Sequence, residues 1–217
     1  MDLVAFDHLA GVPIYYARQP VAPYGTMGKG PRTVRLESTF KTELERCLVD
    51  LWKVSKLGPA EALVSGGCYV EKAGRHGEGR AIDIDAIWWK GQPPLVTRNA
   101  PQDAVRYLGV EAVLRMHVGT ILDFWYNGAH EDHWHCDNGG TPEWREGSRA
   151  RTVFMQAALT YVFGHELVGG IDGNLGGSTR RALTDVVYSP SEKTIKAVNT
   201  PIWLMFLSKV IAKAFGT

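Results

Sequence analysis

The sequence predicts an α+β fold in which a small antiparallel sheet with flanking helices is followed by a small C-terminal three-helix domain. Two observations support this prediction. Apolar residues recur with helical spacing in several segments, and the alternating run from Asp83 to Ile87 is typical of a strand with one buried face. The chain has 217 residues, of which 45% are hydrophobic, and this suffices for one substantial core and a small additional domain. We place the domains at residues 1–148 and 149–217.

The N-terminal domain opens with a loop and a helix. Residues 18–32 contain three prolines and three glycines, which predicts an exposed loop. Residues 38–57 predict a helix, with Ser38 or Thr39 as its cap and Gly58 as its stop. The apolar face of this helix consists of Phe40, Leu44, Cys47, Leu48, Leu51 and Val54.

Three more elements are expected before the second domain. Residues 62–64 predict a short strand that leads into Ser65-Gly66-Gly67. Residues 102–116 predict a second helix. Residues 120–126 form an apolar segment that we expect to be another strand or the end of a helix.

Two polar clusters in the N-terminal domain predict a metal site. The first runs from His76 to Asp83, and the second from His130 to His135. Imidazole and carboxylate groups suit zinc, and a catalytic zinc typically has three protein ligands and an open fourth position. We therefore expect His76, Asp83 and His135 to bind Zn²⁺, with His76 on a Gly-rich loop that leads into the strand at Asp83.

The motifs in these clusters are His76-x-x-Gly79-x-Ala81-x-Asp83 and Asp132-His133-x-His135. Over residues 63–137 the chain resembles the zinc D-Ala-D-Ala carboxypeptidase and L-Ala-D-Glu endopeptidase family of cell-wall peptidases, including its extensin-like branch. The resemblance implies that the three expected ligands hold zinc, that Asp132 is the general base and that His133 stabilises the transition state. The implied reaction is hydrolysis of a peptide bond without a covalent intermediate.

Two acidic residues compete for the role of general base. If residues 131–135 form a regular strand, Glu131 shares a face with His135 while Asp132 points away. The family spacing, with an acid three residues before the last ligand, favours Asp132 instead. We choose Asp132, because a bend before the ligand would turn it toward the metal, and we keep Glu131 as the alternative.

The chain departs from the family pattern at two positions near the expected site. Many members have a serine two residues before the first ligand, where this chain has Gly74. Many also have an arginine after a Ser-Gly-x element, whereas here residues 65–67 lead to Cys68. The cation that usually faces the substrate carbonyl is thus missing from its expected place, and Arg75 and Lys72 are candidates to replace it.

The C-terminal third carries a second resemblance. Residues 153–159 have helical spacing, residues 172–176 read Asp-Gly-Asn-Leu-Gly, and residues 179–183 start another helix. This order resembles the three-helix peptidoglycan-binding domain. A third apolar helix face follows, made of Trp203, Phe206, Leu207, Val210 and Ile211. The alternative is that residues 150–217 are a helical cap on the catalytic domain.

Composition and local patterns narrow the classes of function. The formal net charge of +1 gives no general attraction to nucleic acid or to an anionic membrane. The three cysteines, Cys47, Cys68 and Cys136, are an odd number, so a complete disulfide framework is excluded, while a bridge between Cys68 and Cys136 stays open. No signal peptide is evident, and the apolar stretch at residues 202–211 is too short to span a membrane.

The sequence therefore leads to the expectation of a zinc-dependent peptidoglycan peptidase of the endolysin type, which hydrolyses a bond in the stem peptide or cross-link. We expect a monomer whose partner is peptidoglycan, without nucleic-acid binding or membrane insertion. It would be made in the cytoplasm and act on the cell wall from the periplasmic or extracellular side. Two alternatives remain: a catalytically silent zinc-containing wall-binding protein, and a D,D-carboxypeptidase of the exported autolysin type.

Overall fold

The computed structural model describes residues 2–217, which form a mixed α and β protein. The strands of this part are β1 (Leu3–Phe6), β2 (His8–Leu9), β3 (Val12–Tyr15), β4 (Val34–Glu37), β5 (Ala62–Gly67), β6 (Ala81–Trp88), β7 (Leu95–Val96), β8 (Thr120–Leu122) and β9 (Trp134–Asp137). Its α-helices are α1 (Ser38–Val54), α2 (Ala104–His117), α3 (Arg149–Tyr161), α4 (Gly177–Val187) and α5 (Thr200–Phe215). Two 3-10 helices, η1 (Thr97–Asp103) and η2 (Gly128–His130), precede α2 and β9.

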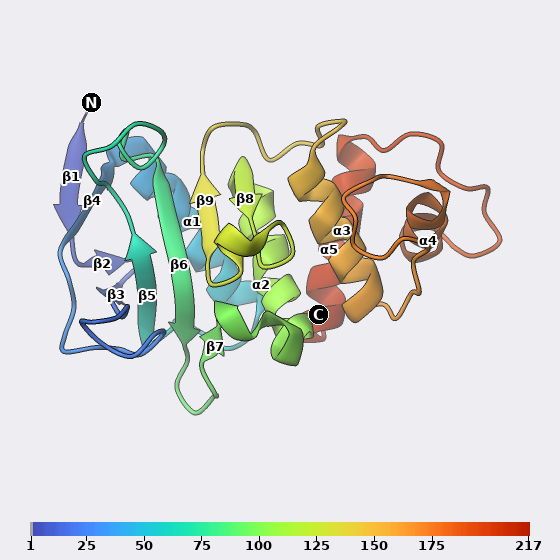
Figure 1. Ribbon diagram of the computed structural model, residues 1–217. Coiled ribbons are helices and arrows are strands. Elements are labelled where there is room, and N and C mark those ends of the chain that lie inside the picture. Colours follow the sequence, from blue (N-terminus) through green and yellow to red (C-terminus); the bar gives the residue numbers. More distant parts are fainter. Residues whose placement is uncertain (1) are drawn as a thin grey trace.

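The main sheet is mixed rather than antiparallel. Its strands follow the order β2-β3-β5-β6-β9-β8, with β7 also paired to β6, while β1 and β4 form a separate two-stranded ribbon (Figure 1). The pair β3–β5 is parallel, and the other neighbouring strands are antiparallel. The prediction of an antiparallel sheet is therefore wrong for β3–β5. The chain passes through β4 and α1 between these two strands, and such a long crossover returns it in the same direction.

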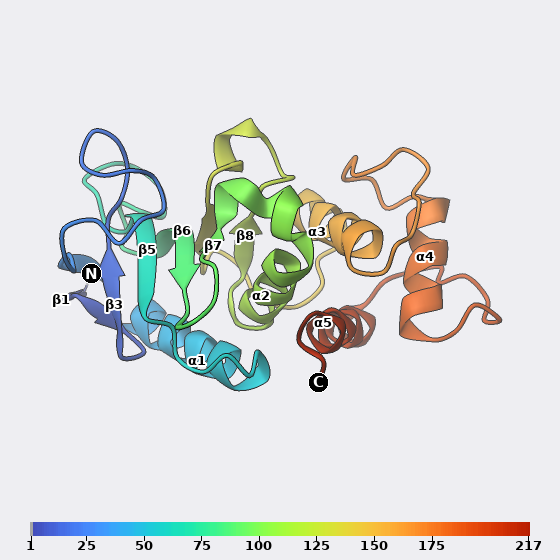
Figure 2. The same ribbon diagram turned by 90° about the horizontal axis from the view of Figure 1, so that it is seen from below.

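Helix α1 agrees closely with the predicted helix over residues 38–57. Its cap is the side chain of Glu37, which accepts a hydrogen bond from the backbone N–H of Phe40, and not Ser38 or Thr39. The expected apolar face is buried from Phe40 to Leu51. Figure 2 shows α1 against one face of the sheet, while the segments after β3 and before β9 rise from the opposite face.

The predicted helix over residues 102–116 is also present as α2. Ten of its residues are buried, including Glu111 and Arg115, so α2 lies inside the molecule. The guanidinium of Arg115 donates to Glu111 at 2.8 Å and to the carbonyl of Ala150 at 3.2 Å. Because Ala150 belongs to α3, this buried arginine joins the first C-terminal helix to α2. The segment over residues 120–126, expected to be a strand or the end of a helix, contains the short strand β8 at its start.

Helices α3, α4 and α5 lie in the C-terminal part, while a separate three-helix domain stays a prediction. Gln156 in α3 accepts from the backbone of Gly173 at 2.8 Å and donates to Asp172 at 2.8 Å and to Thr179 at 3.2 Å. One buried glutamine thus holds together the helix, the Asp-Gly turn and the start of α4. These are the three segments that carry the second resemblance.

Helix α5 packs against α2 of the N-terminal part (Figure 2). A Cβ atom added at Gly109 of α2 would meet the side chains of Ala214 and Phe215, so the absence of a side chain there permits the close contact. One hydrophobic core runs from the strands through α1 and α2 into α3, α4 and α5. The division at residues 148 and 149 stays a prediction.

The cysteines and the helices bear on two further expectations. All three cysteines are free and buried, so no Cys68–Cys136 bridge is present. Burial raises the pKa of the Cys68 thiol to about 12, which keeps it protonated. Within residues 2–217, every helix is too short or too polar to cross a bilayer.

Candidate metal centre

Three side chains meet where β6 and β9 pair. Asp83 lies opposite His135 in the antiparallel register, and His76 reaches both from the loop between β5 and β6. Nε2 of His76 is 3.2 Å from Oδ1 of Asp83 and 3.3 Å from Nδ1 of His135, and these last two atoms are 3.0 Å apart. The structure thus brings the expected ligands together in a cluster that could hold a metal ion.

The loop before β6 has the tight turn that His76 requires. A Cβ atom at Gly77 would overlap the carbonyl oxygen of Lys72, so only glycine fits there. Gly79 has a φ of +65°, and an added Cβ would overlap the side chain of Leu3. The backbone N–H of Gly79 donates to the carbonyl of His76 at 3.0 Å, which closes the turn.

Hydrogen bonds outside the cluster fix the orientation of both imidazoles. Nδ1 of His76 donates to the carbonyl of Cys68 at 2.8 Å, and Nε2 of His135 donates to Oδ2 of Asp137 at 3.1 Å. Asp137 is itself held by the backbone N–H of Gly139 at 2.6 Å. These bonds turn the other nitrogen of each ring toward Asp83, where both could act as ligands. Sequence reasoning missed Asp137, although it lies two residues after His135 and so on the same strand face.

The electrostatics of the cluster favour a cation. Burial by itself raises the pKa of Asp83, but hydrogen bonds from His135 and His76 outweigh it and hold the pKa below its ordinary value. Burial likewise lowers the pKa of His135, but Asp137 and Asp83 outweigh it and raise the pKa to about 9. Asp83 and Asp137 thus stabilise positive charge at His135, and the same carboxylates would stabilise a metal ion.

Asp132 and His133 lie in the turn between η2 and β9. Nδ1 of His133 donates to Oδ1 of Asp132 at 2.6 Å, and Nε2 of His133 is 3.6 Å from Oδ1 of Asp83. Glu131 is exposed and forms no side-chain hydrogen bond or ion pair within residues 2–217. Strand β9 begins only at Trp134, so the alternation that favoured Glu131 does not apply.

Arg18, which sequence analysis placed in an exposed loop, lies beside this pair. It makes two hydrogen bonds of 2.8 Å to the buried carboxylate of Asp85, and its Nη2 is 3.6 Å from Oδ1 of Asp132. Arg98 reaches the other oxygen of Asp132 at 3.7 Å. The hydrogen bonds to Asp85 raise the pKa of Arg18, so its guanidinium stays charged. The sequence indicates such a partner, because Asp85 lies on the same strand face as Asp83 and a buried carboxylate requires a cation beside it.

The cations suggested by the sequence are placed differently. Nη1 of Arg75 is 2.6 Å from a carboxylate oxygen of Glu78. Lys72 is exposed and forms no ion pair within residues 2–217. Arg18 and Arg98, rather than Arg75 or Lys72, are therefore the cations next to Asp132.

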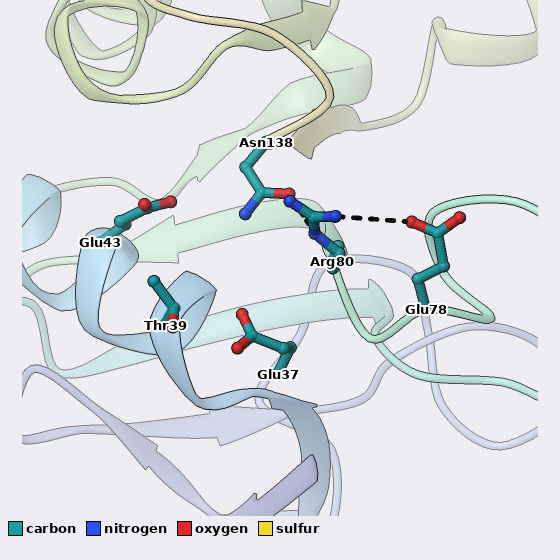
Figure 3. A pocket seen from close by; sticks show the side chains of 6 residues that line it. All are labelled: Glu37, Thr39, Glu43, Glu78, Arg80 and Asn138. Carbon is teal, nitrogen blue, oxygen red and sulfur yellow. Dashed lines mark hydrogen bonds and ion pairs between the residues drawn. The ribbon is translucent and has the colours of Figure 1, made fainter. Parts of the chain in front are cut away.

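A separate pocket of about 460 Å³ lies at the start of α1 (Figure 3). It is lined by Glu37, Thr39, Glu43, Glu78, Arg80 and Asn138. Nε of Arg80 donates to Oδ1 of Asn138 at 2.9 Å, and Nη1 faces Glu78 at 4.0 Å. None of the three residues of the metal cluster lines this pocket.

The fold and the cluster together define a mixed α and β protein with a candidate metal centre. No family model, curated protein or solved structure matches the chain. Function must therefore be argued from the geometry of this centre and from the resemblance of its motifs.

Proposed function

We propose that the protein is a zinc-dependent peptidase that hydrolyses a peptide bond in the stem peptide or cross-link of the bacterial cell wall. The observation that carries this proposal is the cluster of His76, Asp83 and His135 with Asp132 and His133 directly beside it. Two imidazoles and one carboxylate are a donor set that catalytic zinc uses, with a fourth position left open.

The spacing of the donor atoms supports zinc. Tetrahedral zinc with ligand bonds of about 2.0–2.2 Å separates neighbouring ligand atoms by about 3.3–3.6 Å. The three separations in the cluster are 3.0, 3.2 and 3.3 Å, so a small outward movement of the side chains would fit them around the ion. Calcium, in contrast, takes six to eight oxygen ligands, which this nitrogen-rich set does not offer.

The surrounding side chains support hydrolysis. A zinc ion, when bound, supplies Lewis acidity that polarises a carbonyl group and activates water near neutral pH. The carboxylate of Asp132 accepts the proton of the attacking water and passes it to the leaving amine. His133 holds Asp132 through Nδ1 and turns Nε2 toward the cluster. Arg18, anchored on Asp85, fixes the position of Asp132 from the other side.

The C-terminal helices are proposed to bind peptidoglycan. The network of Gln156 supports this, because it joins the three segments whose order resembles the peptidoglycan-binding domain. A wall-binding unit suits an enzyme that acts on the polymer, so we propose an endopeptidase rather than a D,D-carboxypeptidase. It would act as a monomer from the periplasmic or extracellular side of the wall.

The experiment is release of new amino groups from purified peptidoglycan, followed by mass spectrometry of the fragments. Release that a chelator abolishes and zinc restores supports the peptidase and identifies the bond. Asp132→Asn should lower the rate by about 10² to 10⁴-fold with unchanged zinc content. Glu131→Gln, its matched neighbour, should remain close to the unmodified protein.

Two results would contradict the proposal. If the Asp132→Asn variant is as active as the unmodified protein, Asp132 is not the general base. Zinc binding without release from any of several wall chemotypes would favour the silent wall-binding protein.

A further inference from the structure

A second pocket lies next to the candidate metal centre. It has a volume of about 440 Å³ and is formed by the ends of β3 and β5 and the start of β4. Its volume is in the range of pockets that hold small ligands. The lining residues that matter here are Tyr16, Arg32, Arg35, Gly66, Gly67 and Tyr69.

Two glycines line this pocket on the side of the metal cluster and Arg18. Gly67 lies opposite Asp83 in the pairing of β5 with β6. A Cβ atom at Gly67 would be 3.3 Å from Oδ2 of Asp83 and 3.9 Å from Cε1 of His76, and one at Gly66 would overlap the guanidinium of Arg18. Because Gly67 has no side chain, its backbone borders both the pocket and the cluster.

The pocket carries two arginines and no acidic residue. The guanidinium of Arg32 lies 4.7 Å from the ring centroid of Tyr16, and that of Arg35 lies 4.9 Å from the ring centroid of Tyr69. The backbone N–H of Arg32 donates to Ile14 at 2.7 Å, and the carbonyl of Arg35 accepts from Tyr69 at 3.1 Å. Both side chains are exposed, and neither forms an ion pair within residues 2–217. Stacked, uncompensated guanidinium groups of this kind are suited to bind carboxylates.

The end of β5 lies beside these arginines. The parallel pairing of β3 with β5 stops at Val64, while β5 continues to Gly67 and pairs there with β6. The hydroxyl of Ser65 accepts from the backbone N–H of Gly67 at 3.3 Å and donates to its carbonyl at 3.2 Å. These bonds hold the backbone at Gly67 in place between the pocket and Asp83.

We propose that this pocket binds a carboxylate of the peptide substrate, with Arg32 and Arg35 as its ligands, while the scissile bond lies at the adjoining metal centre. This inference rests on the proposed peptidase function. It names the substrate class as peptides that carry an acidic group near the scissile bond.

The test compares two peptides, N-acetyl-Ala-Glu-Ala-Ala-amide and its Gln counterpart, which differ only in a carboxylate. Their binding to the zinc-loaded full chain is measured by isothermal titration calorimetry, with Asp132→Asn in all samples to prevent turnover. We expect the Glu peptide to bind about tenfold more tightly, because a hydrogen-bonded charge pair contributes that much or more. The double variant R32Q/R35Q should bind both peptides equally.

Two further variants control for charge and folding. R32K/R35K keeps the cations and should retain a preference for the Glu peptide, although a weaker one because lysine cannot make the paired contact. Arg46→Gln removes an exposed arginine of α1 that does not line this pocket, and it should leave the preference unchanged.

An R32Q/R35Q variant that keeps the preference, or a parent protein that shows none, overturns the proposal for this pocket. Binding is read without turnover, so the outcome does not depend on the peptidase assay. Absence of wall hydrolysis together with an intact preference would contradict the peptidase and leave the carboxylate pocket standing.

Discussion

Replacement of Arg18 by methionine tests its buried ion pair with Asp85 most directly. The change removes both 2.8 Å hydrogen bonds to Asp85, whose side chain is fully buried. Removal of one partner from a buried ion pair costs about 3–5 kcal/mol, and we expect about 3 kcal/mol because Arg18 itself is 28% exposed. For a chain of this length, that corresponds to a fall in Tm of about 6–12 °C.

The assay is urea unfolding of the metal-free protein, in a double-mutant cycle of Arg18→Met and Asp85→Asn. The double variant should lose less stability than the sum of the single variants, because Asp85→Asn removes the charge that Arg18→Met leaves unpaired. Arg46→Met on the exposed face of α1 serves as the matched control. Additive effects, or a loss for Arg18→Met below about 1 kcal/mol, would refute the idea that Arg18 neutralises Asp85.

Three further predictions concern the metal and the C-terminal helices. Asp137→Asn should weaken zinc binding about tenfold to hundredfold, since it removes the acceptor that orients His135; competition with a chromophoric chelator measures this, and unchanged affinity would exclude that role. Zinc at about 100 times its Kd should stabilise the protein by about 2.7 kcal/mol in thermal unfolding, and a chelator should reverse the shift; an unchanged Tm would contradict binding to the folded state. Gln156→Ala should lower the free energy of unfolding in urea by about 2 kcal/mol, because its partners lose their hydrogen bonds. Gln102→Ala, at an exposed position, should be nearly neutral. Similar losses for both variants would show that the Gln156 network does not stabilise the fold.

The ligand cluster could be predicted from the sequence because local features determine most of it. The glycines between His76 and Asp83 allow a tight loop, and the alternation after Asp83 indicates a strand. Only the pairing of that strand with His135 is a long-range feature, and the two motifs together pointed to it. The helices were likewise predictable from apolar spacing.

Other parts of the site and fold depend on contacts that no local pattern reveals. Arg18 reaches Asp85 across 67 positions of sequence, from a segment whose prolines and glycines predict only a loop. The choice between Glu131 and Asp132 depended on where β9 starts, and strand starts are poorly determined by periodicity. Helix α5 packs on α2 through two apolar faces. The apolar spacing of α5 is the same whether residues 150–217 form a separate domain or a helical cap, so the sequence does not reveal this contact.

The balance of charge around the cluster gives an independent reason to expect a divalent cation. Four carboxylates lie in or beside it: Asp83, Asp85, Asp132 and Asp137. Two guanidinium groups contact them: Arg18 and Arg98. The pKa of His135, raised to about 9, keeps a proton on its ring near neutral pH, and this charge offsets one of the two excess negative charges in the metal-free protein. A divalent ion at the cluster would displace that proton and balance the remaining charge, so the arginines and the metal would neutralise the carboxylates together.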